Sequence, residues 1–215
     1  MPAAVPVREL GYAHQVEGAG FWDDLTNEPT PELVWPKSVE VFDRMRRQDA
    51  QVSSVLRAVS SPILRTGWSI DGKGVPDEVV EFVASNLGLP ILGAEIDGDN
   101  TATLRGRDRF SWSAHTRLAL TCLPFGHSYF EQVYRYDEAG MARLRKLAFR
   151  PQRSISKINV ARDGGLVSIE QHQPAMVPGT PGSKALPVSR LVAYVLEREG
   201  GNWLGVSLLR AAYKN

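Results

Sequence analysis

The chain has 215 residues, of which 43% are hydrophobic and 23% are charged, and its formal net charge is +1. This length is enough for one or two domains with a real core, and the charge balance excludes a uniformly basic DNA-coating protein and an acidic disordered chain. The single cysteine excludes an intrachain disulfide and a zinc site with several thiolates, and no apolar run reaches the roughly 18 residues of a membrane span.

The amino-terminal part is predicted to be an arm followed by a long helix. Residues 1–37 are rich in proline, glycine and acidic residues, and we expect an extended arm that is ordered only where an aromatic residue docks. From Phe42 to Val59, apolar residues recur at three- and four-residue steps. This spacing predicts one long amphipathic helix, with Ser38 as its N-cap.

Asp49 falls on the apolar stripe of this predicted helix, where a carboxylate requires a partner. Arg46 and Arg47 are close by in the sequence. A structural ion pair is therefore the favoured interpretation, and a catalytic carboxylate is the minor one.

Three further elements and one loop are predicted before residue 127. Residues 63–72 have the composition of a strand. A proline at position 76 suits the first turn of a second helix, which presents Val79, Phe82, Val83 and Leu87. The polar stretch 93–109 is predicted to be a loop. Ser111 is expected to cap a third helix over residues 112–123, which ends at Pro124 and Gly126.

Beyond Gly126 the hydrophobic period changes from helical to two, which indicates strands. Two antiparallel hairpins are predicted, each with a turn that contains aspartate and glycine: 127–136 with 141–150, and 154–161 with 166–171. The proline-rich stretch 173–187 is predicted to be a loop, and 190–199 is compatible with a strand or a helix. Helices followed by antiparallel strands indicate an α+β fold.

The sequence predicts no catalytic residue, no metal ligand and no cofactor. Ser128 and Ser207 each follow a Gly-x pair, but Phe130 and Leu209 stand where a nucleophile elbow has its second glycine. Ser207 is more simply the N-cap of a helix. The four histidines lack metal-type partners at i+3 or i+4. A serine hydrolase is a distant alternative, which a serine-reactive probe tests.

Basic residues concentrate in the hairpin region, where alternating strand positions share one face that can contact phosphates. A solubilising face is the simpler interpretation, because no aromatic platform interleaves the charges. The candidate phosphate contacts are Arg143, Arg145, Arg150 and Arg153.

Three stretches resemble the portal proteins of tailed bacteriophages, of the Mu-like kind common in actinobacterial phages. They are RMRRQDAQVSSVLRAVSSPILRTGWSI, FSWSAHTRLALTCLPFGHSYFEQVYRY and LVAYVLEREGGNWLGVSLLRAAYKN. The last looks like that family's Gly-x-Ser-x-Leu-Arg turn into a helix. With the spacer DGGLVSIEQ, the resemblance covers roughly residues 30–215.

The resemblance implies a non-catalytic component of a portal ring, usually of about twelve subunits, at one capsid vertex of the virion. Its implied partners are further copies of the chain, the major capsid or scaffold protein, the terminase, the head–tail adaptor and the double-stranded DNA that passes through the channel. It has no membrane partner, and the host cytoplasm is the implied place of assembly. The alternative is a nucleic-acid-binding module that uses the basic hairpin face.

A complete portal subunit is about twice this length or more, so the resemblance implies a truncated chain. By this resemblance, residues 38–215 are expected to be the first half of the wing, an α+β region, without the stem, clip and crown. The motif positions expected to set the fold or an interface are Asp49, Arg57, Trp68, Gly126, Trp203, Gly205 and Ser207.

Several of these positions have an expected part in the fold. Gly126 is expected to end a helix, and Gly205 with Ser207 to start one. Trp68 and Trp203 are expected to be core or intersubunit anchors.

The predicted carboxyl-terminal helix has apolar residues that its usual neighbours would cover in a longer chain. We expect Leu208, Leu209 and Tyr213 to be exposed on it, and the isolated chain to associate or aggregate as a result.

Overall fold

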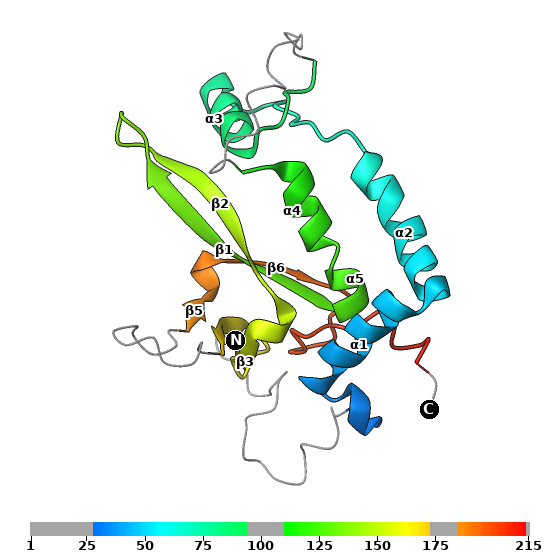
Figure 1. The fold of residues 1–215 in the computed structure, drawn as a ribbon. Coiled ribbons are helices and arrows are strands. Elements are labelled where there is room, and N and C mark those ends of the chain that lie inside the picture. The colour runs from blue at the N-terminus through cyan, green and yellow to red at the C-terminus, as the bar shows by residue number, and fades with distance from the viewer. Residues whose placement is uncertain (1–27, 94–109, 173–184, 214–215) are drawn as a thin grey trace, which may run out of the picture.

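The computed structural model describes residues 28–93, 110–172 and 185–213 (Figure 1). The helices are α1 (Lys37–Gln48), α2 (Ala50–Arg65), α3 (Asp77–Leu87), α4 (Trp112–Ala119) and α5 (Cys122–Phe125). The strands are β1 (His127–Tyr136), β2 (Ala142–Arg150), β3 (Ile155–Val160), β4 (Leu166–Gln171), β5 (Leu186–Pro187) and β6 (Leu191–Val195). They form two three-stranded sheets, ordered β2-β1-β6 and β3-β4-β5. The predicted α+β class is confirmed.

Most of the predicted arm, residues 1–27, lies outside the described residues. Of the rest, Pro31–Leu33 forms a 3-10 turn that buries Leu33. Trp35 packs against both hydrophobic clusters of the protein. The segment before α1 is therefore anchored by an aliphatic and an aromatic side chain.

The prediction of one long helix from Ser38 onward is wrong, because the helix breaks at Asp49. That residue has extended backbone dihedrals, with φ −95° and ψ 117°. Its carboxylate accepts hydrogen bonds from the backbone N–H groups of Gln51 (2.8 Å) and Val52 (3.1 Å), which makes it the N-cap of α2. Helix α1 begins at Lys37, and Ser38 is a buried residue inside it rather than its cap.

The strand predicted over 63–72 is also wrong. Helix α2 continues to Arg65 with Pro62 inside it, and only Ile70 forms a parallel bridge, with Ile91. Ile70 donates to the carbonyl of Pro90 (2.9 Å) and accepts from Leu92 (2.8 Å). A two-residue contact of this kind is too short to build a ladder, so the apolar pattern of this stretch did not produce a strand.

Helix α3 confirms the second predicted helix, although it buries a different face. Val80 and Ala84 are its buried residues, whereas Val79 and Val83 are 50% and 37% exposed. The loop predicted over 93–109 lies outside the described residues except for Gly93.

The third predicted helix begins where expected but is interrupted. The hydroxyl of Ser111 accepts a hydrogen bond from the backbone N–H of Ala114, as the capping prediction requires. Helix α4 then ends at Ala119, and the short helix α5 follows. Gly126 ends α5 with a φ of +84°, in the left-handed region that favours glycine, so its predicted place at a helix end is confirmed.

Both predicted hairpins are confirmed as β1–β2 and β3–β4. The ambiguous segment 190–199 contains β6, which pairs antiparallel with the first half of β1. Of the loop predicted over 173–187, residues 173–184 lie outside the described residues, and Leu186–Pro187 forms β5 instead. Strand β1 lies between β2 and β6, but β6 pairs only with its first half. The start of β1 is therefore buried, and its end, at the tip of the hairpin, is exposed.

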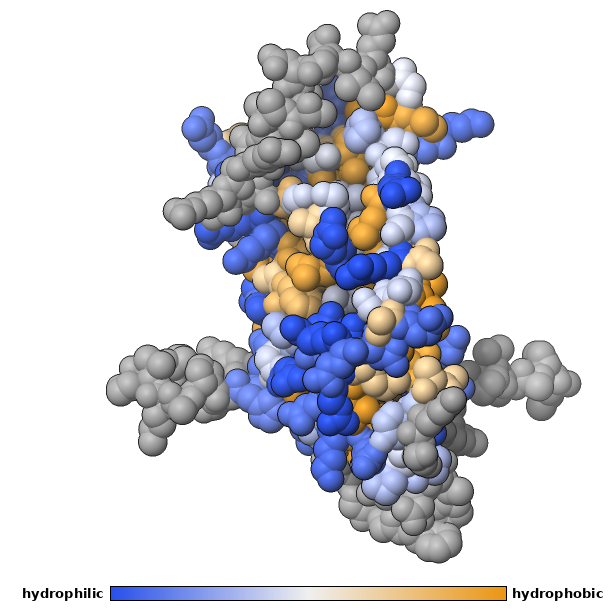
Figure 2. All heavy atoms as spheres, turned by 45° about the vertical axis from the view of Figure 1, so that its right-hand side comes forward, coloured by the Kyte–Doolittle hydropathy of each residue, from blue (hydrophilic) through white to orange (hydrophobic). Residues whose placement is uncertain are grey.

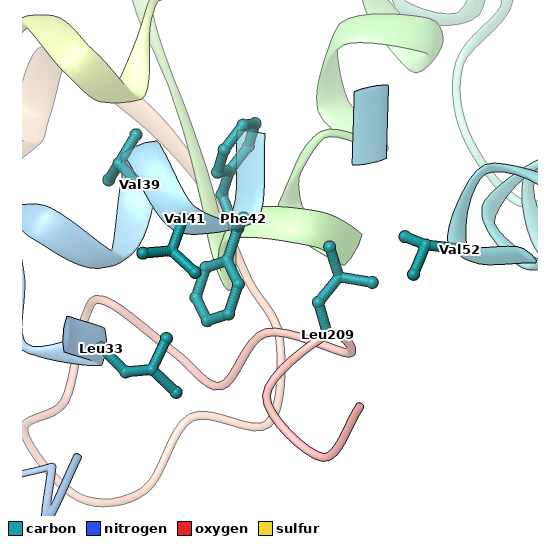
Figure 3. Close-up of a cluster of buried hydrophobic side chains, with 7 residues drawn as sticks. Leu33, Val39, Val41, Phe42, Val52 and Leu209 are labelled. Carbon is teal, nitrogen blue, oxygen red and sulfur yellow. The ribbon is translucent and has the colours of Figure 1, made fainter. Parts of the chain in front are cut away.

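Two clusters of buried hydrophobic residues hold the molecule together. The first joins α1, α2, α5 and the carboxyl-terminal segment through Leu33, Val39, Val41, Phe42, Val52, Phe125 and Leu209 (Figure 3). The second lies on the strands and contains Tyr129, Ile155, Leu166, Ile169 and Leu191. Trp35 packs against both, so they form one continuous apolar region.

The carboxyl-terminal segment corrects two expectations. Within the described residues, 208–212 form consecutive turns and not a helix, so the expectation that Gly205 and Ser207 start a helix is wrong. Leu209 is only 4% exposed and belongs to the first cluster, so the expectation that it faces solvent is wrong. Tyr213 is half-buried against the same cluster, while Leu208 is 40% exposed as expected. Leu209 packs inward, and its backbone N–H donates to the hydroxyl of Ser207 (3.0 Å).

Candidate functional site

The junction of α5, β1 and the carboxyl-terminal segment is closely packed. Gly126 and Gly205 lie against each other with φ values of +84° and +64°. A Cβ atom on Gly126 would lie 2.5 Å from the carbonyl oxygen of Leu204, and one on Gly205 would collide with the carbonyl oxygen of Gly126. Only glycine allows two backbones to approach this closely.

Backbone hydrogen bonds complete this junction. The carbonyl of Gly126 accepts from the N–H of Leu196 (2.8 Å), and the N–H of Leu208 donates to the carbonyl of Leu123 (2.9 Å). The hydroxyl of Ser207 donates to the carbonyl of Pro124 (2.6 Å) and accepts from the N–H of Leu209 (3.0 Å). Three predicted motif residues, Gly126, Gly205 and Ser207, therefore act together as a backbone clamp.

His127 and Tyr129 extend the clamp into the core. The Nδ1 of His127 lies 3.0 Å from the carbonyl of Leu204, which can only accept, so Nδ1 carries the proton. Burial lowers the pKa of His127 to about 4, and the ring is neutral at pH 7. The hydroxyl of Tyr129 donates to the carbonyl of Trp203 (2.6 Å), and burial raises the pKa of Tyr129.

Neither candidate serine is arranged as a nucleophile in this geometry. Ser128 donates to the carbonyl of Leu118 (3.2 Å), and Ser207 is engaged by two backbone groups. In the described part of the chain, neither hydroxyl is hydrogen-bonded to a histidine. A serine triad requires such a bond between nucleophile and base.

An aromatic layer separates α4 from the sheet β2-β1-β6. His115 is 5% exposed and hydrogen-bonds through Nε2 to the hydroxyl of Tyr194 (2.8 Å). Its ring packs against Phe130 at 4.4 Å between centroids, and Trp112 also contacts it. Burial lowers the pKa of His115, so this histidine is a neutral core residue.

The remaining motif residues are dispersed. Trp203 is half-buried; its indole N–H donates to the carbonyl of Gly164 (2.8 Å), and Arg198 lies 4.5 Å above its ring. Trp68 is 44% exposed and touches Trp112 edge-on, so within one chain it is not a core residue. Arg57 is exposed on α2.

The candidate phosphate contacts do not form one row of unpaired charges. Arg143 pairs with Asp137 at 2.8 Å, Arg150 pairs with Glu131, and Arg153 pairs with Asp43 at 3.1 Å. Arg145 is exposed. A register irregularity in the β1–β2 ladder also interrupts the alternation that the one-face prediction assumed.

Asp43, and not Asp49, is the centre of the ion-pair network. Its carboxylate accepts from Arg46 (2.7 Å), Arg47 (3.1 Å) and Arg153 (3.1 Å). Burial by itself would raise the pKa of Asp43, but the arginine hydrogen bonds outweigh it and hold that pKa below its ordinary value. The i+3 and i+4 spacing of the two helical arginines was the available signal.

A second ion pair, which no sequence pattern indicated, joins the two ends of the described chain. Arg210 donates from Nε and Nη2 to the two carboxylate oxygens of Glu28, both at 2.6 Å. This bidentate geometry lowers the pKa of Glu28, although burial acts in the opposite direction. The contact fixes the segment before α1 onto the carboxyl-terminal turns.

A surface pocket of about 310 Å³ lies beside α3, and its charged lining comprises Asp71, Lys73, Asp77 and Glu81. Over residues 28–93, 110–172 and 185–213, no three side chains gather as metal ligands would. The same ranges contain no helix with the length and apolarity needed to cross a bilayer.

The comparison with known protein families gives one result. The family model described as the portal protein of Mu bacteriophage matches residues 39–215. No curated protein matches the chain.

Proposed function

The chain belongs to the Mu bacteriophage portal protein family, and on this premise we propose that it is part of the wing of a portal ring, the head–tail connector through which genomic DNA is packaged and ejected. Portal family proteins are non-catalytic structural proteins, and family membership implies an oligomeric ring with capsid components. The observation that carries the proposal is the extent of the match, which runs from the third residue of α1 through every later helix and strand.

The geometry is compatible with a structural role, in which the chain holds other protein chains in position. The glycine clamp at Gly126 and Gly205 joins α5 to the carboxyl-terminal segment, and the Glu28–Arg210 pair joins that segment to the residues before α1. In this role the chain contributes to a ring of about twelve subunits at one capsid vertex of the virion, assembled in the host cytoplasm. Its partners are the capsid or scaffold protein, the terminase and the head–tail adaptor, and DNA passes through the completed channel.

Native mass spectrometry and negative-stain imaging of particles purified from the natural source test this proposal. We expect the chain to be found in a ring of about twelve subunits. A species with the mass of one chain, absent from any ring, would contradict a portal role.

A nucleic-acid-binding module remains the second candidate. The observation that favours it is the excess of positive charge at Asp43, where three arginines share one carboxylate. It predicts DNA binding that weakens steeply with salt and that the double substitution Arg47→Ala/Arg153→Ala reduces. Binding that is unchanged by these substitutions, or no binding at low salt, removes this candidate.

A further inference from the structure

Helix α2 is attached to the rest of the chain along one side only. Of its sixteen residues, Val52 alone is buried, and its neighbours in the fold are α1 and α4. Beside Val52, three and seven residues further on, Val55 and Val59 are 49% and 41% exposed, and Ala58 and Pro62 next to them are also exposed. Positions i, i+3, i+4 and i+7 form a continuous stripe on a helix.

This side of the molecule is a mixed apolar and basic surface. Figure 2 turns the side that bears α2 toward the viewer and shows hydrophobic residues at the surface between polar ones. The charged residues of α2 are Arg57 and Arg65, both exposed, and the helix contains no aspartate or glutamate. Arg65 lies three residues after Pro62 and extends the stripe, whereas Arg57 lies on another side of the helix. An exposed apolar stripe that ends in a cation is typical of a contact with another molecule.

Helix α3 has the opposite charge. Asp77, Glu78 and Glu81 are exposed on it at i, i+1 and i+4, and the helix contains no lysine or arginine. Within the described part of the chain, none of these three carboxylates and neither arginine of α2 forms an ion pair. Each surface therefore carries charge that the fold leaves uncompensated.

The surface beside α3 is also hollow and partly apolar. Three carboxylates, those of Asp71, Asp77 and Glu81, and one cation, Lys73, line the pocket of about 310 Å³, together with Leu92, which is 63% exposed. Val79, 50% exposed, lies on the same helix. A concave surface with carboxylates and aliphatic side chains suits an arginine that protrudes next to an apolar stripe.

The stripe of α2 and the acidic surface of α3 do not pack against each other within one chain. Helix α3 packs on β2, whereas α2 packs on α1 and α4, and α4 lies between them in Figure 1. Two different but complementary surfaces on one subunit produce a head-to-tail contact, which closes into a ring when the rotation per subunit allows it.

We propose that the solvent-facing stripe of α2 in one subunit packs against the acidic surface of α3 in the next copy of the chain. This inference rests on the proposed function, because a ring supplies the neighbouring copy. It adds which two surfaces meet.

Disulfide crosslinking between two singly substituted chains tests the pairing directly. Ala58→Cys lies on the stripe of α2 and Ser85→Cys lies on the exposed side of α3, and both side chains are small and exposed. We expect a crosslinked dimer when the two variants are mixed and oxidised, and none from either variant alone or from the unsubstituted chain with its half-buried Cys122. A crosslink from Ala58→Cys alone would show that α2 pairs with itself, which would overturn the inference.

Charge reversal gives a second, independent measurement. Arg57→Glu/Arg65→Glu should weaken self-association about tenfold in sedimentation velocity at low salt, because position 65, at the end of the stripe, then faces the carboxylates of α3 with like charge. Adding Asp77→Arg/Glu81→Arg to the same chain should restore association. The matched control, Lys37→Glu/Arg135→Glu, makes the same change in net charge at exposed positions outside both surfaces and should leave association unchanged.

The outcomes separate this inference from the portal role. If natural particles contain the ring, but the variants show neither the crosslink nor an effect of charge reversal, the pairing of α2 with α3 is overturned and the portal role is retained. A chain that forms no ring in natural particles, yet shows the crosslink in the mixture, would remove the portal role and retain the head-to-tail contact. Failure of both the crosslink and the charge rescue overturns the inference in every case.

Discussion

Gly126 and Gly205 pack backbone against backbone, and each has a φ that L-residues with a side chain rarely adopt. We expect Gly126→Ala to lower the free energy of unfolding by about 3 kcal/mol. Roughly 1 kcal/mol reflects the left-handed dihedrals and the rest reflects collision with the carbonyls of residues 204 and 205.

A matched control isolates the two causes in urea denaturation. Gly140 has a φ of +77°, but a Cβ there meets nothing within 4 Å. Gly140→Ala should therefore cost only the conformational part, about 1 kcal/mol. Equal losses for the two variants would mean that the close approach contributes nothing.

His127 should make the protein less stable as the pH falls from about 6.5 to about 4. Burial lowers its pKa to about 4 in the folded state, so the unfolded chain takes up the proton first. Stability is complete above the ordinary histidine pKa and is lost toward the folded value, by about 3 kcal/mol in total. His115, whose pKa burial also lowers, acts in the same direction.

Urea denaturation between pH 7 and pH 4.5 measures this dependence. His127→Asn retains a donor toward the carbonyl of Leu204 and cannot titrate. Its stability should vary less over this range than that of the natural protein. The same slope in both proteins would assign the pH dependence to other groups.

Local signals in the sequence were sufficient for much of the fold. The alternating patterns and Asp-Gly turns located both hairpins, and Ser111 and Gly126 mark helix ends where predicted. The long helix failed at Asp49 because helical periodicity is the same on both sides of a capping residue. The strand over 63–72 failed because an apolar run does not specify its partner.

The candidate site depended on contacts that periodicity does not encode. Gly126 and Gly205 were singled out separately, but only the fold brings them together. The ion pair between Glu28 and Arg210 joins opposite ends of the described chain. The inward position of Leu209 likewise depends on its hydrogen bond to Ser207 and on its packing in the first cluster, which includes Phe42 of α1 and Phe125 of α5.

Asp43→Asn should destabilise the protein by about 2 kcal/mol. Its carboxylate is mostly buried and accepts from three arginines of two distant segments, so its removal leaves guanidinium groups without a counter-charge. Asp137→Asn, at the exposed hairpin tip, removes a carboxylate with one arginine partner and should have a clearly smaller effect. Thermal unfolding of the two variants compares them, and equal shifts would contradict a central role for Asp43.

Asp49 is expected to act through its backbone contacts and not through charge. Asp49→Ala should cost about 1 kcal/mol, because the N–H groups of Gln51 and Val52 lose their acceptor at the start of α2. Asp49→Asn keeps an acceptor and should stay within about 0.5 kcal/mol of the natural protein. An equal loss in both variants under urea would point to an ionic role instead.

Substitutions of Trp203 and Trp68 should affect different properties, the first the stability of the fold and the second self-association. Trp203→Phe removes the indole N–H that bonds to the carbonyl of Gly164 and should lower the free energy of unfolding by about 1 kcal/mol. Trp68→Ala removes an exposed ring and should change it by less than about 0.5 kcal/mol. If Trp68 is an intersubunit anchor, its removal should weaken self-association in sedimentation velocity, whereas Trp203→Phe should not. A large loss of stability in Trp68→Ala would instead make that side chain part of the folded core, packed on Trp112.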